Sequence, residues 1–181
     1  FDRIFYPISQ RIQSIGTALS IGITAPLTIA GALILKTGIT FESAFAGVRK
    51  TVQASEEEFA KLRKEIINLS TTAPVSAVEF AKIAQVAGEL GLKAGDIAKF
   101  SQTVAELQTT TKLTGDEAAT FLGRFTNITG LDPSKIHNLA STLVALGHGF
   151  AANESEIADF SLRIAGAGKI VGLTDGQILA F

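Results

Sequence analysis

The sequence contains no cysteine, and its only histidines are His137 and His148. The absence of cysteine excludes disulfide bonds, thiolate metal sites and cysteine nucleophiles. The 16 Lys and Arg residues nearly balance the 17 Asp and Glu residues, and charged residues make up only 18% of the chain. No cluster of Lys and Arg is interleaved with aromatic residues, so a specific nucleic-acid site is not expected. Apolar residues make up 46% of the chain, which predicts that other copies or partner proteins cover some apolar surface.

Strand patterns are also scarce. No segment alternates apolar and polar residues over a useful length, whereas helix start and stop signals recur along the chain. The sequence therefore predicts an all-α fold: tandem helical hairpins with a repeat of about 40 residues, preceded by an apolar helical segment rich in glycine and alanine.

The repeat is visible in three short stretches, GLKAGDI (91–97), GLDPSKI (130–136) and GLTDGQI (172–178), which share Gly-Leu, four variable residues and Ile. We expect each glycine to end a helix in the left-handed conformation and each Leu–Ile pair to clamp the turn. A phenylalanine early in the first helix of each hairpin is expected to fill the space between units. The residues predicted to pack the repeats are Phe80, Gly91, Leu92, Ile97, Phe121, Gly130, Leu131, Ile136, Phe160, Gly172, Leu173 and Ile178.

Helix starts recur with the same period. Ser76, Thr114 and Asn153 are each followed three residues later by Glu, the pattern of a capping box in which side chains satisfy free backbone amides at a helix start. Upstream, Ser55 shows the same pattern, and Thr40 is expected to cap a helix with Phe41, Phe45 and Val48 on one face. At the turn of the middle hairpin, Asp132 is expected to cap the second helix.

Three regions are predicted from these signals. Residues 1–39 form an apolar helical segment, residues 40–75 an amphipathic helical region with a linker at 70–76, and residues 76–181 the hairpin repeats. The third hairpin stops just after its second helix begins, and the chain starts with Phe1. We therefore expect these residues to be a piece of a longer protein whose repeat region is truncated at its C-terminal end.

Residues 12–35 carry no charge, and a run of this length can span a bilayer. Pro26 lies in its middle, where it interrupts the helical hydrogen bonds, and small residues recur along it at spacings that let helices approach closely. These features favour a buried helix pair that faces other copies over a membrane span, and both alternatives stay open. The residues that characterise the segment are Gly16, Gly22, Pro26 and Gly31.

Residues able to carry out chemistry are few. His137 with Asp132 is the one candidate for a base and its partner, but a surface histidine and an N-cap explain them more simply. His148 is expected at a helix end, where a positive charge is favourable. Gly168 and Lys169 lack the Ser or Thr and the preceding strand of a phosphate loop. We expect no catalytic residues, no cofactor and no metal, and hence no enzymatic activity.

Taken in order, several segments resemble the core region of phage tail tape measure proteins. They are TAPLTIAGALILKTG, FESAFAGVRKT, FAKLRKEIINLSTTAPVSAVEFAKIAQVAGELGL, FSQTVAELQTTTKLTGDEAATFLGRFTNITGL and FSLRIAGAGKIVGLT. The resemblance covers the chain from about residue 15 to its end. Each segment alone is a weak signal, and their order makes the pattern specific.

The resemblance implies a structural role. Such proteins lie inside the tail tube of long-tailed phages or phage-like particles, set the tube length during assembly, and assist genome ejection across the host envelope. The implied partners are coaxial copies of the chain (three or six, guessed from symmetry), tail tube, distal tail and tail hub proteins, tail assembly chaperones, and the host membrane on ejection. The implied location is the virion, with the host cytoplasm during assembly and the host membrane during infection. Two alternatives are a free-standing α-solenoid interaction module and a membrane-active, pore-forming protein that acts through residues 12–35.

Overall fold

Helix starts in the chain depend on side chains that bond to free backbone amides. Complete capping boxes open α2 (Glu56–Thr72), α5 (Gly115–Thr129), α7 (Glu154–Ile170) and α8 (Asp175–Ala180). Their N-caps are Ser55, Thr114, Asn153 and Thr174, and the first three confirm the sequence prediction. At the starts of α2 and α5, the hydrogen bond that the glutamate accepts from the N-cap backbone amide lowers the pKa of Glu58 and Glu117, with the cap hydroxyl adding to the effect.

The computed structural model describes residues 38–149 and 152–181. Residues 41–181 form one compact unit, and residues 1–40 belong to a second unit. The predicted apolar helices of residues 1–37, with Gly16, Gly22, Pro26 and Gly31, lie outside the described residues.

One predicted capping box is only half formed. At the start of α3 (Ala77–Glu89), the Ser76 hydroxyl accepts a hydrogen bond from the Glu79 amide, as predicted. The Glu79 carboxylate, however, accepts a hydrogen bond from Gln108 Nε2 of α4 (Ala94–Thr110) at 2.7 Å. It therefore joins two helices instead of completing the cap. The amide of Gln108 is partly buried, so a protein acceptor for it is worth more than the reciprocal cap bond.

The first described helix begins earlier than predicted. Residues 38–51 are helical, so Thr40 lies within the helix and is not its N-cap. The predicted apolar face is confirmed, since Phe41, Phe45 and Val48 are all buried.

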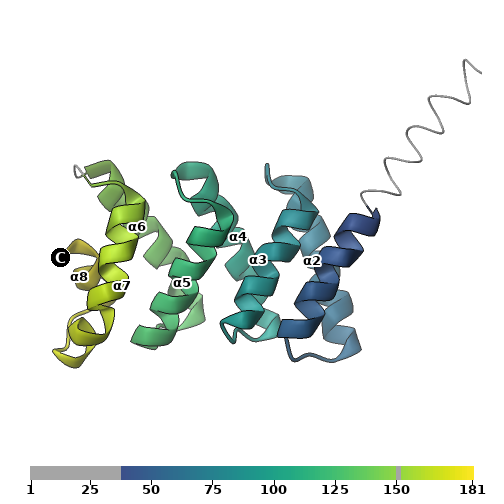
Figure 1. Cartoon of the computed structure of the whole chain (residues 1–181), viewed down its shortest axis with the longest axis horizontal. Helices are drawn as coiled ribbons and strands as arrows, with labels where there is room; N and C mark the ends of the chain where they lie inside the picture. The colour runs from purple at the N-terminus through teal and green to yellow at the C-terminus, as the bar shows by residue number, and fades with distance from the viewer. Residues whose placement is uncertain (1–37, 150–151) are drawn as a thin grey trace, which may run out of the picture. The chain divides into compact units, whose positions relative to one another are not determined.

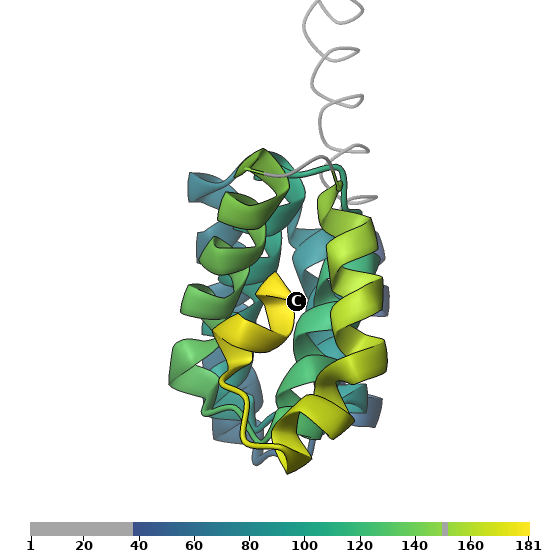
Figure 2. The same cartoon turned by 90° about the vertical axis from the view of Figure 1, so that its left-hand side faces the viewer.

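The unit is built from successive helical hairpins in two layers. In each hairpin we call the first helix A and the second helix B. The A helices are residues 41–51, α3, α5 and α7, and the B helices are α2, α4, α6 (Ile136–Gly149) and α8. Each A helix from α3 to α7 packs against the next A helix, and each B helix packs against the next B helix (Figure 1). Figure 2 looks along the stack and shows the two layers facing each other.

The core runs between the layers without a break. Its largest fully buried side chains come from hairpins along the whole stack, among them Leu62 in α2, Phe80 in α3, Phe125 in α5 and Leu143 in α6. No strand occurs in residues 38–149 or 152–181, which confirms the predicted all-α class. Such a stack places each hairpin against its neighbours only, so its stability is close to a sum of hairpin and interface contributions.

Residues 41–72 form a hairpin of the same kind as the three that follow. The segment predicted as a linker, 70–76, contains the end of α2 at Thr72 and a short loop in which Val75 is buried. Across this loop, α2 packs on both α3 and α4. The Thr51 hydroxyl donates a hydrogen bond to the Gln85 carbonyl of α3 at 3.1 Å. The first hairpin thus shares the core of the stack.

Candidate functional site

The residues of the repeated Gly-Leu turns are the best candidates for residues on which the function of this chain depends. Gly91, Gly130 and Gly172 have φ of 84°, 67° and 85°, a region that residues with a Cβ rarely adopt. At the first turn the Leu92 amide donates to the Ala87 carbonyl at 3.0 Å and the Gly91 amide donates to the Gly88 carbonyl at 2.9 Å. This is the Schellman motif, which satisfies carbonyl groups that the helix leaves free.

The leucines and isoleucines of the turns lie on the inside of the stack. Ile97, Ile136, Ile178 and Leu131 are buried, while Leu92 and Leu173 are half-buried and pack against the core. At the third turn a Cβ on Gly168 would lie 2.8 Å from Ile178 and 3.5 Å from Leu173. Both side chains therefore lie against one glycine, which leaves room for them between α7 and α8.

The three phenylalanines predicted to fill the spaces between units differ in their environment. Phe80 and Phe121 are buried, but the Phe160 side chain is 47% exposed and does not fill a space between units. The three are also not equivalent, because Phe80 lies in the first turn of its helix, whereas Phe121 and Phe160 lie in the second. The residue of α3 that corresponds to Phe121 is Ile83, which is buried.

Polar side chains fix neighbouring helices relative to one another. Asn127 Nδ2 of α5 donates to the Leu90 carbonyl at the end of α3 at 2.8 Å, as Thr51 does to Gln85 one hairpin earlier. The sequence gives no signal for these bonds, because their partners lie about one repeat apart and follow no motif. They hold the first A helix in register with α3, and α3 in register with α5.

The first hairpin presents charged groups over its aromatic side chains. The guanidinium carbon of Arg49 lies 4.6 Å from the Phe59 ring centre, and that of Arg63 lies 5.5 Å from the Phe41 ring centre. Arg49 also pairs with Glu56, and Arg63 pairs with Glu42. The hydrogen bond between Arg49 and Glu56 raises the pKa of Arg49 and lowers the pKa of Glu56. These pairs place a polar layer on the outer side of the buried phenylalanines.

The candidate chemical groups have structural partners. His137 Nδ1 lies 3.3 Å from Glu106 Oε2 of α4, and both side chains are about half exposed. Asp132 instead bonds the side chain and amide of Ser134, which lowers its pKa, and so caps the short 3-10 helix Pro133–Lys135 that leads into α6. The sequence could not identify Glu106, because it comes from a different helix of the stack.

The remaining candidates also take part in helix ends and helix packing. His148 lies in the last turn of α6, as predicted. Lys169 Nζ lies 3.3 Å from Asp175 Oδ1 and links α7 to α8. Within the described residues no group of three or more His, Asp or Glu side chains is arranged to hold a metal ion. No helix among the same residues is both long and apolar enough to cross a bilayer. The described residues form packing surfaces between hairpins.

Comparison with known proteins gives one match. The model of a family described as phage-related minor tail protein matches residues 63–181, which span α3 to α8 and most of α2. No curated protein and no solved structure matches the chain. The match covers more than half of the 181 residues and coincides with the stacked hairpins, so the chain belongs to the phage-related minor tail protein family.

Proposed function

We propose that this chain is part of a tape measure protein, which lies inside a phage tail tube, sets the length of the tube during assembly and assists genome ejection. The observation that carries the proposal is the coincidence of the minor tail protein match with the stacked hairpins. The ordered segments that resemble tape measure proteins lie in the same part of the chain.

A stack of hairpins suits a ruler because its length adds up unit by unit. Helices that pack side by side lie about 8 to 10 Å apart, so each further hairpin extends a stack by about 10 Å. The bonds from Thr51 to Gln85 and from Asn127 to Leu90 fix the offset between successive A helices. A unit with a fixed offset contributes a fixed length.

The charge of the chain suits a protein that must enter a tube and leave it again. The formal net charge is only −1, so long-range attraction to a charged wall would be weak. We further propose that coaxial copies of the chain, tail tube and hub proteins, and assembly chaperones are its partners. The apolar segment at residues 12–35 is proposed to face sister copies in the virion or to enter the host membrane on ejection.

Tail length in the phage that encodes the chain tests the ruler directly. One repeat, residues 92–130, is inserted again after Gly130 in one to four copies, which preserves the Gly-Leu turn at each junction. If the hairpins remain stacked, the mean tail length measured by electron microscopy increases by about 10 Å per copy, or about 40 Å for four copies. A repeat drawn out into one continuous helix would add about 60 Å per copy.

A matched control inserts residues of the same number and composition in scrambled order, which should not assemble as an additional hairpin. Tails whose length is the same across the whole insertion series, while the longer protein is present in the purified virions, would contradict the ruler.

A further inference from the structure

One position of the A helices differs sharply between hairpins. Counted from the N-cap, the seventh residue is Ile83 in α3, Phe121 in α5 and Phe160 in α7. The exposed fraction is 3% for Ile83 and 3% for Phe121, but 47% for Phe160. The same repeat position is therefore covered in two hairpins and uncovered in the third.

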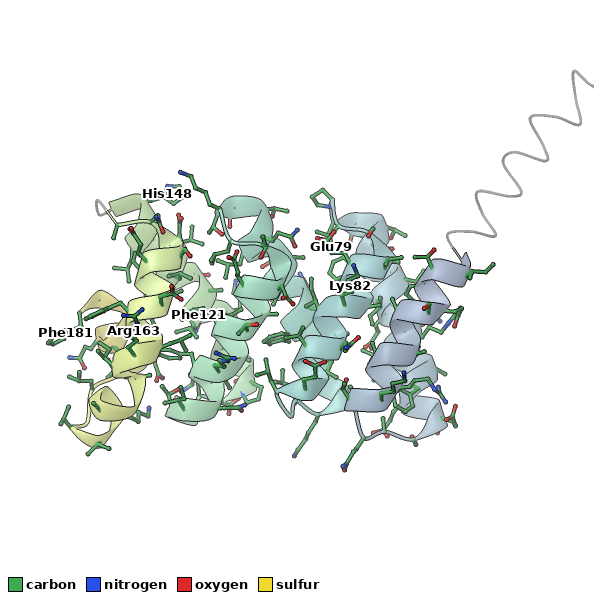
Figure 3. All side chains as sticks on the ribbon, viewed as in Figure 1. Glu79, Lys82, Phe121, His148, Arg163 and Phe181 are labelled. Atoms are coloured by element: carbon green, nitrogen blue, oxygen red, sulfur yellow. The ribbon has the colours of Figure 1, made fainter. Side chains whose placement is uncertain are left out.

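The two covered residues show what covers this position. Ile83 Cδ1 lies 3.5 Å from where a Cβ on Gly115 would be, at the start of α5. Phe121 shares a groove with Ser155, Ala158 and Leu162 of α7, and Figure 3 shows it on the side of α5 that faces α7. In both cases the first turns of the next A helix lie over the larger side chain.

The covering helices share a chemical feature. In α3, α5 and α7 the fifth residue after the N-cap is an alanine, and these alanines, Ala81, Ala119 and Ala158, are all buried. A small residue here lets the helix approach the bulky side chain of the preceding hairpin. The helix that fits Phe160 is therefore amphipathic, with small residues in its first two turns.

The surface around Phe160 is apolar and hollowed. A groove of about 390 Å³ is lined by Leu146 of α6, Ile157 and Phe160 of α7, and Leu179 and Phe181 at the end of α8. Phe181 is 82% exposed, and Figure 3 shows it beside α8 at the same end of the stack as Arg163 of α7. Burial of such a surface against another helix is favourable.

The charged residues of the A helices favour the same kind of docked helix. Arg163 has the position in α7 that Arg124 has in α5, ten residues after the N-cap. Arg124 lines the same groove as Asp159 of α7. An A helix over Phe160 would place the residue that corresponds to Asp159 near Arg163. The first hairpin of a second copy offers no such match, because ion pairs of Arg49 and Arg63 lie over its phenylalanines.

We propose that the apolar end formed by α7 and α8 is a docking surface for one further A helix, carried by a hairpin that continues the stack in the same direction. The helix has alanine at its fifth position and an acidic residue at its sixth, as α7 has. Its first turns cover Phe160 as α7 covers Phe121.

An extended chain tests this proposal. Ile136 and Ile178 are equivalent in the repeat, so residues 140–172 added after Phe181 supply the rest of a B helix and a second copy of α7. We expect the melting temperature to rise by about 5 to 10 °C relative to the original chain, because a phenylalanine-sized apolar surface becomes buried. A matched extension carries Ala158→Glu in the added copy only and should lose this gain.

A second measurement reports whether the side chain at position 160 becomes buried. The chain contains no tryptophan, so Phe160→Trp introduces a unique fluorophore. Its emission should move to shorter wavelength and become protected from iodide in the extended chain, but not in the Ala158→Glu extension. Equal melting temperatures and equal emission in the two extended chains would overturn the proposal. So would a dimer of the original chain, measured by light scattering, that Phe160→Glu dissociates, since a second copy would then occupy the surface.

Discussion

Phe125→Ala is expected to lower the free energy of unfolding by about 3 to 5 kcal/mol, the usual cost of removing a fully buried phenylalanine. Phe125 lies in α5, which packs against α3, α4, α6 and α7, and its side chain is 0% exposed. Its ring centre also lies 5.8 Å from that of Phe121. Because α5 packs against four other helices, the cavity cannot close by a shift of one neighbour.

The measurement is urea unfolding followed by circular dichroism. In a domain of this size the same loss lowers the melting temperature by roughly 6 to 20 °C. Phe160→Ala is the matched control, because it removes the same side chain from the same helix layer at a site that is 47% exposed. It should cost less than about 1 kcal/mol. Similar losses for the two variants would contradict the position of α5 at the centre of the core.

Gly88→Ala is expected to destabilise the chain by about 1 to 3 kcal/mol, although alanine is the better helix former. A Cβ at this position would lie 2.5 Å from Thr51 Oγ1, 2.6 Å from Val52 Cγ2 and 3.1 Å from the backbone carbon of Thr51. The backbone atom cannot move aside without shifting the first A helix against α3. The glycine thus marks a close approach between the first two hairpins.

Gly166→Ala provides a control of opposite sign. Gly166 lies inside α7, and the nearest atom to an added Cβ is Ile128 Cγ2 at 3.9 Å, an ordinary contact distance. Replacement should therefore stabilise the chain by up to about 1 kcal/mol through helix propensity. Both variants are measured by thermal unfolding. If Gly88→Ala stabilised the chain as much as Gly166→Ala, the close packing of the first hairpin on α3 would be wrong.

The local features of the fold were predictable from the sequence because their causes are local. Ser55, Thr114 and Asn153 each cap the helix that they were expected to cap. Gly130 has a positive φ, as expected for a glycine that ends a helix in a Gly-Leu turn. Each of these outcomes depends on fewer than about seven neighbouring residues.

Features that depend on the stack were not predictable. Glu79 bonds Gln108, and His137 lies beside Glu106, through contacts between helices that no short motif encodes. Phe160 was expected to fill a space between units but is 47% exposed, because its environment depends on which helix lies next to α7. Thr40 was expected to be a cap, but residues 38–51 are one continuous helical run, so a cap residue type alone did not locate a helix start.

Membership in the phage-related minor tail protein family makes the chain a component of a phage tail and of the virion. The candidate site is correspondingly a set of packing surfaces. Their core positions, such as Ile97 and Gly130, could be identified from the repeat alone. The outer contacts could not, since a single sequence carries no record of which tail proteins or sister copies lie against each face.

The proposed function requires that the hairpins stay stacked in the assembled tail. The chain has no cysteine, so Ile128→Cys with Gly166→Cys introduces one pair, on α5 and α7, where an added Cβ on Gly166 would lie 3.9 Å from Ile128 Cγ2. Intact tails that carry this pair are oxidised, and the joined peptides are measured by mass spectrometry. Stacked hairpins predict a disulfide within one chain in most copies. Tails of normal length in which the two cysteines remain unjoined, although the isolated chain forms the bond readily, would contradict the account.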